Sequence, residues 1–122
     1  EMIHQGEPST SGGFGIFRTC SLNDGADIND LRGALKARSA ALAEAGSTAT
    51  SHMWFGGVGI SNELQGSVIL ARIFPSVQAW GKGLDMYFAN DFSEVEAGLA
   101  DAATCGPLRA YMGKPFYAAA PN

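Results

Sequence analysis

The chain has 122 residues, of which 46% are hydrophobic and 16% are charged, and its formal net charge is −4. This length fits one domain, because two smaller pieces could not each bury a core. An acidic chain lacks the basic stripe that phosphate binding needs, which argues against a nucleic-acid partner. The sequence has no run of about 18 apolar residues, so we expect no membrane span. Soluble proteins average roughly 25% charged residues, and the lower value here predicts that some apolar surface meets a partner.

The N-terminal part of the chain is polar and rich in Gly, Ser and Pro. Residues 1–13 are therefore predicted to be a flexible, extended arm with no core of its own, and residues 14–122 a single folded domain. The chain starts at Glu1, without an initiator methionine. Either a removed leader or an artificial boundary of the cloned segment explains this start, and the sequence leaves both open.

The first predicted elements are a strand and a long helix. Side chains alternate between two faces over 14–22, which predicts the strand. Asp27 then caps a predicted helix that runs to about Ala45 and stops at Gly46. The expected buried stripe of this helix consists of Ile28, Leu31, Ala34, Leu35, Arg38, Leu42 and Ala45.

Two more strands are predicted over 48–60 and 67–74, joined as a hairpin by the polar stretch 61–66. The strand 67–74 has apolar residues on both faces, which indicates that both faces are covered. A second helical region follows over 77–104, broken or kinked at two glycines and again near residue 90. The last predicted strand is 107–112, and a tail follows it.

These elements occur in the order βαββαβ, which predicts a ferredoxin-like α+β fold. In that fold, two helices cover one face of a four-stranded antiparallel sheet. The other face is left bare, and a second copy of the chain is the simplest cover for it. In its element order over about 14–112, the chain resembles the dimeric α/β-barrel superfamily, whose protomers pack sheet to sheet. The resemblance implies a homodimer but no particular function, because that superfamily contains monooxygenases, haem-degrading enzymes, isomerase-like proteins and stress proteins.

The histidines and aromatic residues give weak signals for a site. His52 and Trp54 share one side of a predicted strand, where they either wall a pocket or pack as an aromatic pair. No set of ligands at usable spacing predicts a metal site. The haem-degrading relatives place an axial histidine on the second helix, where this chain has Trp80 and Tyr87, which are further candidates for a pocket. The resemblance therefore implies no haem, and we expect no cofactor.

Arg18 and Arg72 are unusual, because each lies among apolar residues in a strand expected at the centre of the sheet. An isolated buried charge is costly, so each needs a partner or a wet cavity. One reading has both facing the barrel interior as a fork for a small organic anion, such as a carboxylate. The other has them paired with acidic residues or reaching solvent at a strand end. The acidic candidates are Glu63, Asp85 and Glu94. Arg109 in the last strand is a further candidate for a pocket.

Cys20 and Cys105 are the only cysteines in the chain. Antiparallel pairing of the first and last strands brings them together, which predicts a disulfide with the Cα atoms roughly 4.4–6.8 Å apart. The alternative is two buried free thiols that act as small hydrophobic residues. A disulfide favours a periplasmic or secreted protein, whereas free thiols leave a cytoplasmic one open.

No motif identifies a reaction. The first functional hypothesis is a small exported homodimer, a binding or accessory protein that holds an organic ligand in the barrel or docks on a larger assembly. The second is a cofactor-independent monooxygenase or isomerase of the dimeric α/β-barrel type, with His52, Trp54 and Arg72 lining its pocket. The third is a purely structural subunit. An open cavity with convergent polar groups favours a ligand or catalysis, and a filled one favours structure.

Overall fold

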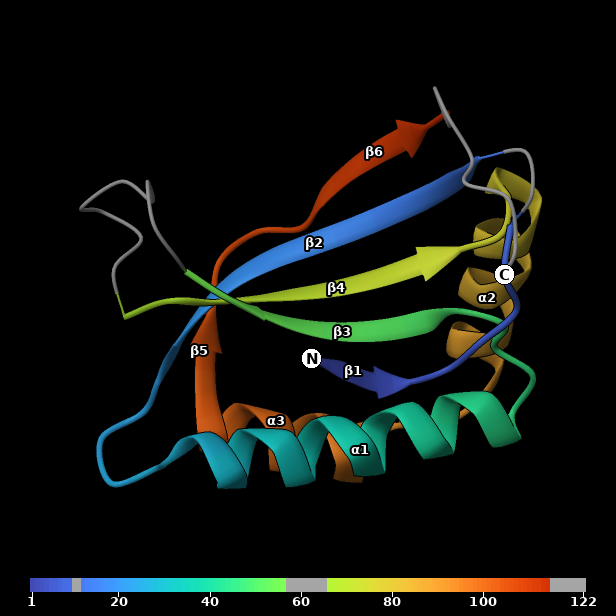
Figure 1. Cartoon of the computed structure of the whole chain (residues 1–122). Helices are drawn as coiled ribbons and strands as arrows, with labels where there is room; N and C mark the ends of the chain where they lie inside the picture. The colour runs from blue at the N-terminus through green and yellow to red at the C-terminus, as the bar shows by residue number, and fades with distance from the viewer. Residues whose placement is uncertain (10–11, 57–65, 115–122) are drawn as a thin grey trace.

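The chain folds into an antiparallel sheet with helices against one of its faces (Figure 1). The structure is a computed structural model, and it describes residues 1–9, 12–56 and 66–114. The elements in chain order are β1 (Met2–His4), β2 (Gly13–Leu22), α1 (Ile28–Glu44), β3 (Thr50–Phe55), β4 (Val68–Phe74), α2 (Val77–Ala89), α3 (Ser93–Ala102), β5 (Ala103–Cys105) and β6 (Arg109–Gly113). The predicted strand 48–60 is thus shorter than expected. Its end and the hairpin turn at 61–65 lie outside the described residues.

The strands follow the order β1-β3-β4-β2-β5, and β6 pairs with β2 as well. The strands β2 and β4 are therefore central, and the last strand of the predicted βαββαβ order runs antiparallel to β2, as expected. The ferredoxin-like α+β arrangement is confirmed, but the count of four strands and two helices is wrong. Gly106 and Pro107 interrupt the last strand, because proline has no N–H to offer the ladder. The second helical region is two helices, separated at residues 90–92.

The N-terminal segment contains a strand, so the prediction of a flexible arm is wrong for its first residues. β1 pairs antiparallel with β3, with Met2 opposite His52 and His4 opposite Ser51. Ile3 packs against the core. Gly6 then passes so close to the backbone of Thr48 that no Cβ would fit there. Three residues are too few to show a strand period, and the neighbouring edge of β3 supplies the hydrogen bonds that order them.

The helix α1 matches its prediction closely. The Asp27 side chain accepts hydrogen bonds from the N–H groups of Asn29 and Asp30, and the Asp30 carboxylate accepts one from the N–H of Asp27. This reciprocal pair is a capping box. Past Ala45 the chain turns at Gly46, whose φ of 111° is one that glycine adopts without strain. The buried residues of the helix are Leu31, Leu35, Ser39 and Leu42.

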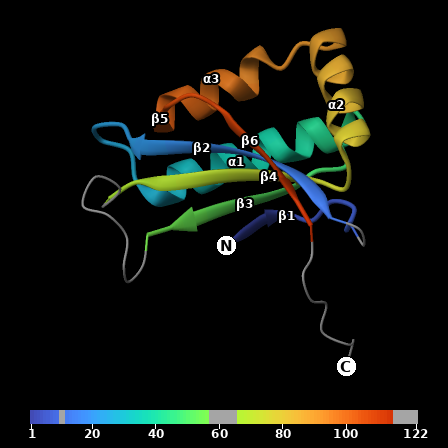
Figure 2. The ribbon, with the colours of Figure 1, turned by 90° about the horizontal axis from the view of Figure 1, so that it is seen from above.

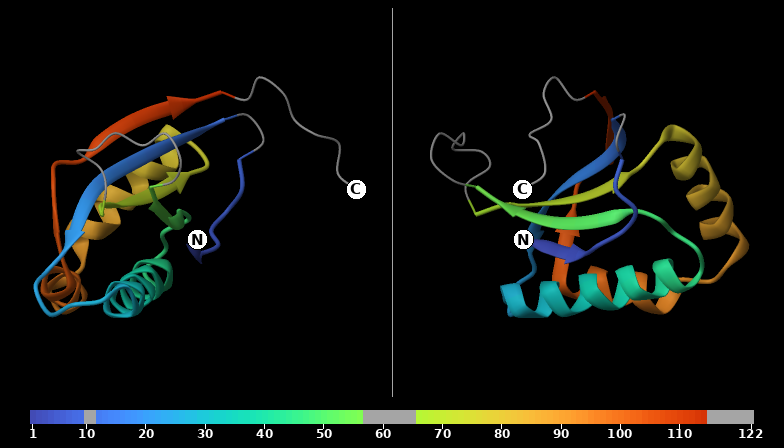
Figure 3. Two further views of the ribbon diagram at one scale, coloured as in Figure 1. Left: turned by 60° about the vertical axis from the view of Figure 1, so that its left-hand side comes forward. Right: turned by 45° about the vertical axis from the view of Figure 1, so that its right-hand side comes forward.

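The three helices lie on the same side of the sheet. The helices α1 and α3 lie side by side against the sheet, and α2 stands at one end of the sheet (Figures 2 and 3). α2 runs without a break through Gly81 and Gly83, contrary to the expected break.

The buried core falls into two clusters, one around Leu31 and Met53, and a smaller one around Phe74. Among the helices described, none is long and apolar enough to cross a membrane.

The predicted disulfide is present between Cys20 and Cys105, with an S–S distance of 2.01 Å. The two residues are directly opposite each other in the ladder between β2 and β5. Their Cα atoms are 4.0 Å apart, slightly less than predicted. The bridge closes a loop of 85 residues and ties the end of α3 to the central strand of the sheet.

Candidate functional site

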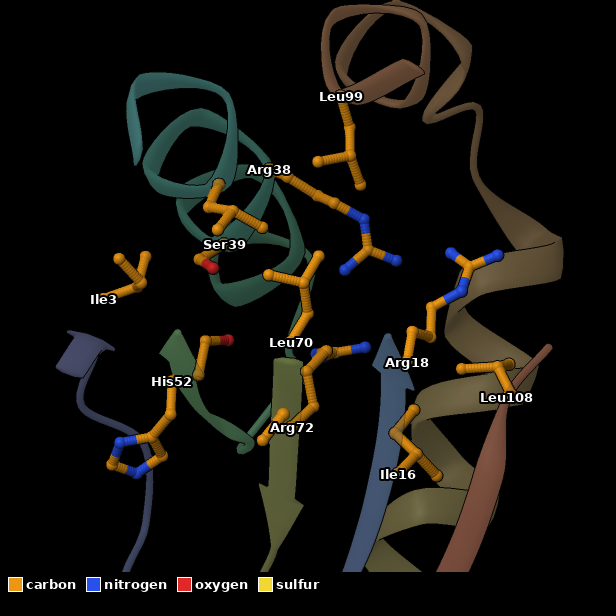
Figure 4. A pocket seen from close by; sticks show the side chains of 13 residues that line it. Ile3, Ile16, Arg18, Arg38, Ser39, His52, Leu70, Arg72, Leu99 and Leu108 are labelled. Carbon is orange, nitrogen blue, oxygen red and sulfur yellow. The ribbon is translucent and has the colours of Figure 1, made fainter. Parts of the chain in front are cut away.

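Three arginines converge in a cavity between the sheet and the helices (Figure 4). Arg18 comes from β2, Arg72 from β4 and Arg38 from α1, and we call these three residues the arginine cluster. The cavity has an inner part of about 80 Å³ and an outer part of about 290 Å³. Residues that line both parts are Ile16, Arg18, Arg38, Arg72 and Leu108. The two parts are therefore adjacent, and the arginine cluster lies between them.

The strand period places these arginines on the helix side of the sheet. In β2, Arg18 alternates onto the same face as Cys20, which belongs to the main core. In β4, Arg72 shares its face with Leu70 and Phe74, which are also core residues. One of the two readings of the sequence put both arginines in the interior of a barrel between two sheets, whereas the structure places them on the helix side of the sheet. Both central strands are apolar on both faces, so the pattern did not distinguish the helix side from the bare side.

The arginine cluster has few acidic partners. Arg38 forms an ion pair with Glu96 of α3, with 2.5 Å between Nε and Oε1. Arg72 donates from Nη2 to Ser47 Oγ at 2.7 Å. Its guanidinium also lies 5.1 Å from the centre of the Phe74 ring. Within the described residues no carboxylate pairs with Arg18 or Arg72. Of the acidic partners considered in the sequence analysis, Asp85 and Glu94 pair with neither arginine, and Glu63 lies outside those residues.

Two donors in the cavity lack any acceptor among the described residues. The Nε atoms of Arg18 and Arg72 are both buried, and neither has a hydrogen-bond partner there. A buried donor without an acceptor costs about 1–3 kcal/mol, and more when the group is charged. Native structures keep few such groups, and each one calls for an explanation, such as a functional role or a bound water or ion. Here both belong to guanidinium groups on the cavity wall, whose positive charge faces the cavity.

The surroundings of Arg72 weaken its hold on its proton. Burial, followed by the neighbouring Arg38 cation, lowers the pKa of Arg72 to about 10, while Glu96 and Tyr87 act in the opposite direction. The guanidinium still carries its charge at neutral pH. Three arginines against one glutamate leave two positive charges unbalanced in a chain whose formal net charge is −4. The cavity therefore has a local excess of positive charge.

The other residues predicted for a pocket divide between two places. Trp80 and Tyr87 lie on α2 and line the outer part of the cavity. His52 reaches the inner wall, but its imidazole turns away from the arginine cluster (Figure 4). Burial and the N-terminal ammonium group lower the pKa of His52. The His52 ring lies 5.9 Å from that of Trp54, which matches the aromatic pair that the sequence analysis left open.

Trp54 and Arg109 lie on the uncovered face of the sheet. There they border a shallow groove of about 250 Å³ with Phe17, Ile69 and Tyr111. The Phe17 ring is 5.5 Å from that of Trp54 and 5.5 Å from that of Tyr111. Arg109 donates from Nη2 to a threonine hydroxyl at 3.0 Å. This face is a second, separate feature, and its arginine does not contribute to the arginine cluster.

Sequence reasoning missed part of the site. Arg38 was predicted to lie in the apolar stripe of its helix, which was a signal that it faces inward. Glu96 on α3 and Ser47 before β3 gave no comparable signal, because only tertiary packing brings them to the arginines. In the part of the chain that the structure describes, no group of three His, Cys, Asp or Glu residues could hold a metal ion.

Comparison with known proteins supports the fold. No protein-family model and no curated protein matches this chain. SnoaB, a cofactor-independent oxygenase from Streptomyces nogalater, is similar over 83% of this chain and 92% of its own, with 8% identity and a TM-score of 0.53. A NIPSNAP family protein of unknown function from Agrobacterium tumefaciens is similar over 92% of this chain and 93% of its own, with 14% identity and a TM-score of 0.57.

A dimeric ferredoxin-like protein from an uncultured marine organism covers 91% of this chain and 94% of its own, with 13% identity and a TM-score of 0.47. At these identities the first two likenesses show the fold alone. They agree with the ferredoxin-like topology. The function has to be argued from the site itself.

Proposed function

We propose that this chain is a binding protein that holds a small organic anion in the cavity between its sheet and its helices. The observation that supports this most directly is the pair of buried Nε donors on Arg18 and Arg72, which have no acceptor among the described residues. Charge-assisted hydrogen bonds from the arginine cluster to a carboxylate would offset the unbalanced positive charge. The volume of the outer part, about 290 Å³, is near the lower end of the range for small-molecule sites.

The test is calorimetric titration of the protein with 2-naphthoate at neutral pH. Wild-type protein is expected to bind it with 1:1 stoichiometry per chain. Arg18→Met should weaken binding about 10–100-fold, because a hydrogen bond to a charged group contributes about 1.5–3 kcal/mol. Lys36→Met is the matched control, since it removes an equal charge from an exposed position of α1. Equal affinities of the two variants would contradict the proposal.

A cofactor-independent oxygenase is the second candidate, because SnoaB carries that description and shares the fold. Such a reaction needs an acidic substrate whose ionised form reduces O₂, and neighbouring arginines favour ionised substrates. Oxygen uptake separates the two functions. An oxygenase consumes O₂ as the ligand disappears, whereas a binding protein returns the ligand with its mass unchanged.

We also infer that two copies of the chain associate through the uncovered sheet face. The path of five strands, at about 4.8 Å per strand and about 23 Å of strand length, presents about 550 Å² per copy. Two such faces bury about 1,100 Å², just above the roughly 1,000 Å² expected of a specific interface. The face is apolar at its centre, and the side chains of Trp54 and Tyr111 are 40% and 55% exposed in the single chain.

Replacing Trp54 by glutamate is expected to dissociate this dimer, because it places a charge on the apolar centre of the face. The dissociation constant should rise at least about 30-fold, as for a central aromatic anchor. Sedimentation equilibrium at micromolar concentrations measures it. Val77→Glu is the control, because Val77 lies on α2, away from this face, with 39% exposure. A wild-type monomer, or a Trp54→Glu dimer of unchanged strength, would refute the interface.

The disulfide supports an oxidising compartment, and we propose that the protein acts in the periplasm or outside the cell. Docking on a larger assembly and a purely structural role remain alternatives to ligand binding. Both alternatives predict that the cavity has no affinity for organic anions. Binding of 2-naphthoate in the titration would therefore count against them, and its absence would favour them.

A further inference from the structure

The two parts of the cavity differ in size, and the arginine cluster lies where they meet. The inner part holds about 80 Å³, and its wall is mostly aliphatic, with the hydroxyl groups of Ser39 and Ser51 added. This volume suits two or three water molecules at about 30 Å³ each. The outer part is larger, at about 290 Å³, and aromatic and aliphatic side chains dominate its wall. The residues found only on the outer wall are Phe74, Trp80, Gly83, Leu84, Tyr87, Phe88 and Glu96.

The helix α2 covers the outer part without burying its own apolar stripe. No residue of α2 is buried, although Trp80, Leu84 and Tyr87 follow helical spacing and face the cavity. Leu84 is 37% exposed, and Phe88 next to it is 79% exposed. An amphipathic helix normally packs such a stripe against a core. Here the smaller core cluster, around Phe74, reaches only the first turns of the helix, through Ala79 and Trp80.

The size of the outer part sets the size of a ligand's apolar body. A dry cavity of about 150 Å³ in another protein holds one benzene molecule. The outer part, at about 290 Å³, has room for roughly twice that volume. An aromatic body suits this wall, because Trp80 and Tyr87 line it and can make aromatic contacts with a further ring.

We infer, on the basis of the proposed anion binding, that the ligand is an aromatic carboxylate with about two fused rings. Its carboxylate lies at the arginine cluster, between the guanidinium groups of Arg18 and Arg72. Its rings fill the outer part beneath α2 and cover Leu84. Two guanidinium groups match the two oxygens of a carboxylate better than they match a phosphate ester, which carries three free oxygens and more charge.

The wild-type protein is titrated by calorimetry with 2-naphthoate, acetate, 2-naphthamide and 2-naphthyl phosphate. We expect 2-naphthoate to bind about 100-fold tighter than acetate, because binding removes the apolar surface of its rings from water. It should also bind at least about 10-fold tighter than the uncharged amide. Acetate binding as tightly as 2-naphthoate, or the phosphate binding more tightly, would overturn the ligand class and leave anion binding intact. Failure of all three anions to bind would overturn the proposed function itself.

Two substitutions on α2 locate the rings. Leu84→Trp fills the mouth of the outer part and should weaken 2-naphthoate at least about 10-fold while changing acetate less than about 2-fold. Val77→Trp, at a similarly exposed position of the same helix that does not line the cavity, should change neither. Thermal melts followed by circular dichroism check that both variants fold. Unchanged 2-naphthoate affinity in a folded Leu84→Trp variant would place the rings elsewhere and refute the inference.

Discussion

Replacing both Cys20 and Cys105 by alanine is expected to lower the free energy of unfolding by about 4–5 kcal/mol. The bridge closes a loop of 85 residues, and on the chain-entropy model its loss frees the unfolded chain by that amount. Domains of this size are stable by only about 5–15 kcal/mol in total, so the loss would remove between about a third and nearly all of that margin. The melting temperature should fall by about 15 °C, given the entropy of unfolding for a chain of this length.

Urea denaturation of the oxidised protein, the reduced protein and the alanine variant measures this effect. The reduced wild type is the control, because it opens the loop and keeps both side chains. It should lie within about 1–2 kcal/mol of the variant. Alkylation of the unfolded protein should add no label before reduction and two labels after it. A loss of less than about 1 kcal/mol on reduction would contradict the stabilising role of the bridge.

Replacing Arg72 by methionine is expected to stabilise the ligand-free protein by about 1–2 kcal/mol. The lowering of the Arg72 pKa to about 10 corresponds to a cost of about 3 kcal/mol for the buried charge. The variant recovers that cost but loses the hydrogen bond to Ser47 and the contact with Phe74, each worth about 1 kcal/mol. Arg38→Met should have the opposite sign, because it leaves Glu96 without its partner.

The stabilisation by Arg72→Met should depend on pH. The folded-state pKa is below the unfolded one, so the wild-type cost is fully present below about pH 10 and disappears as pH rises toward the unfolded value. The gap between variant and wild type should therefore be about 1 kcal/mol smaller at pH 10.5 than at pH 7. Urea denaturation at both pH values measures it. A variant less stable than wild type by more than about 1 kcal/mol at pH 7 would disprove the account of Arg72.

A ligand should reverse this order of stability. At a 2-naphthoate concentration 100 times its dissociation constant, wild-type protein gains about 3 kcal/mol. The Arg72→Met variant should gain much less, because it lacks one of the two donors. The wild type then becomes the more stable protein. This reversal is expected only if Arg72 binds the ligand, and not if its buried charge has no role in binding.

The sequence predicted the centre of the fold because local patterns there agree with tertiary structure. The strand period placed Cys20 and Arg18 on one face of β2, and antiparallel pairing put Cys105 beside Cys20. The capping residue Asp27 marked the start of α1 correctly. These features depend on side-chain alternation and on hydrogen bonds between close neighbours in the chain.

The site was only partly predictable, because its geometry depends on packing between distant segments. Arg18 and Arg72 stood out as charges in apolar strands, but nothing local distinguished the helix side from the bare side. The pairing of Arg38 with Glu96 depends on how α1 lies against α3. β1 is ordered by the edge of β3 and not by its own three residues. Trp54 and Arg109 look like pocket residues in the sequence, but the structure places them on the uncovered face of the sheet.

The most direct test of anion binding is a crystal structure of the protein grown with 2-naphthoate. The account predicts density for the ligand between the sheet and α2, with its carboxylate oxygens about 3 Å from guanidinium nitrogens of Arg18 and Arg72. The rings should lie beside Trp80 and Tyr87. A cavity that contains only water at saturating 2-naphthoate, or a ligand bound on the uncovered face beside Trp54, would contradict it.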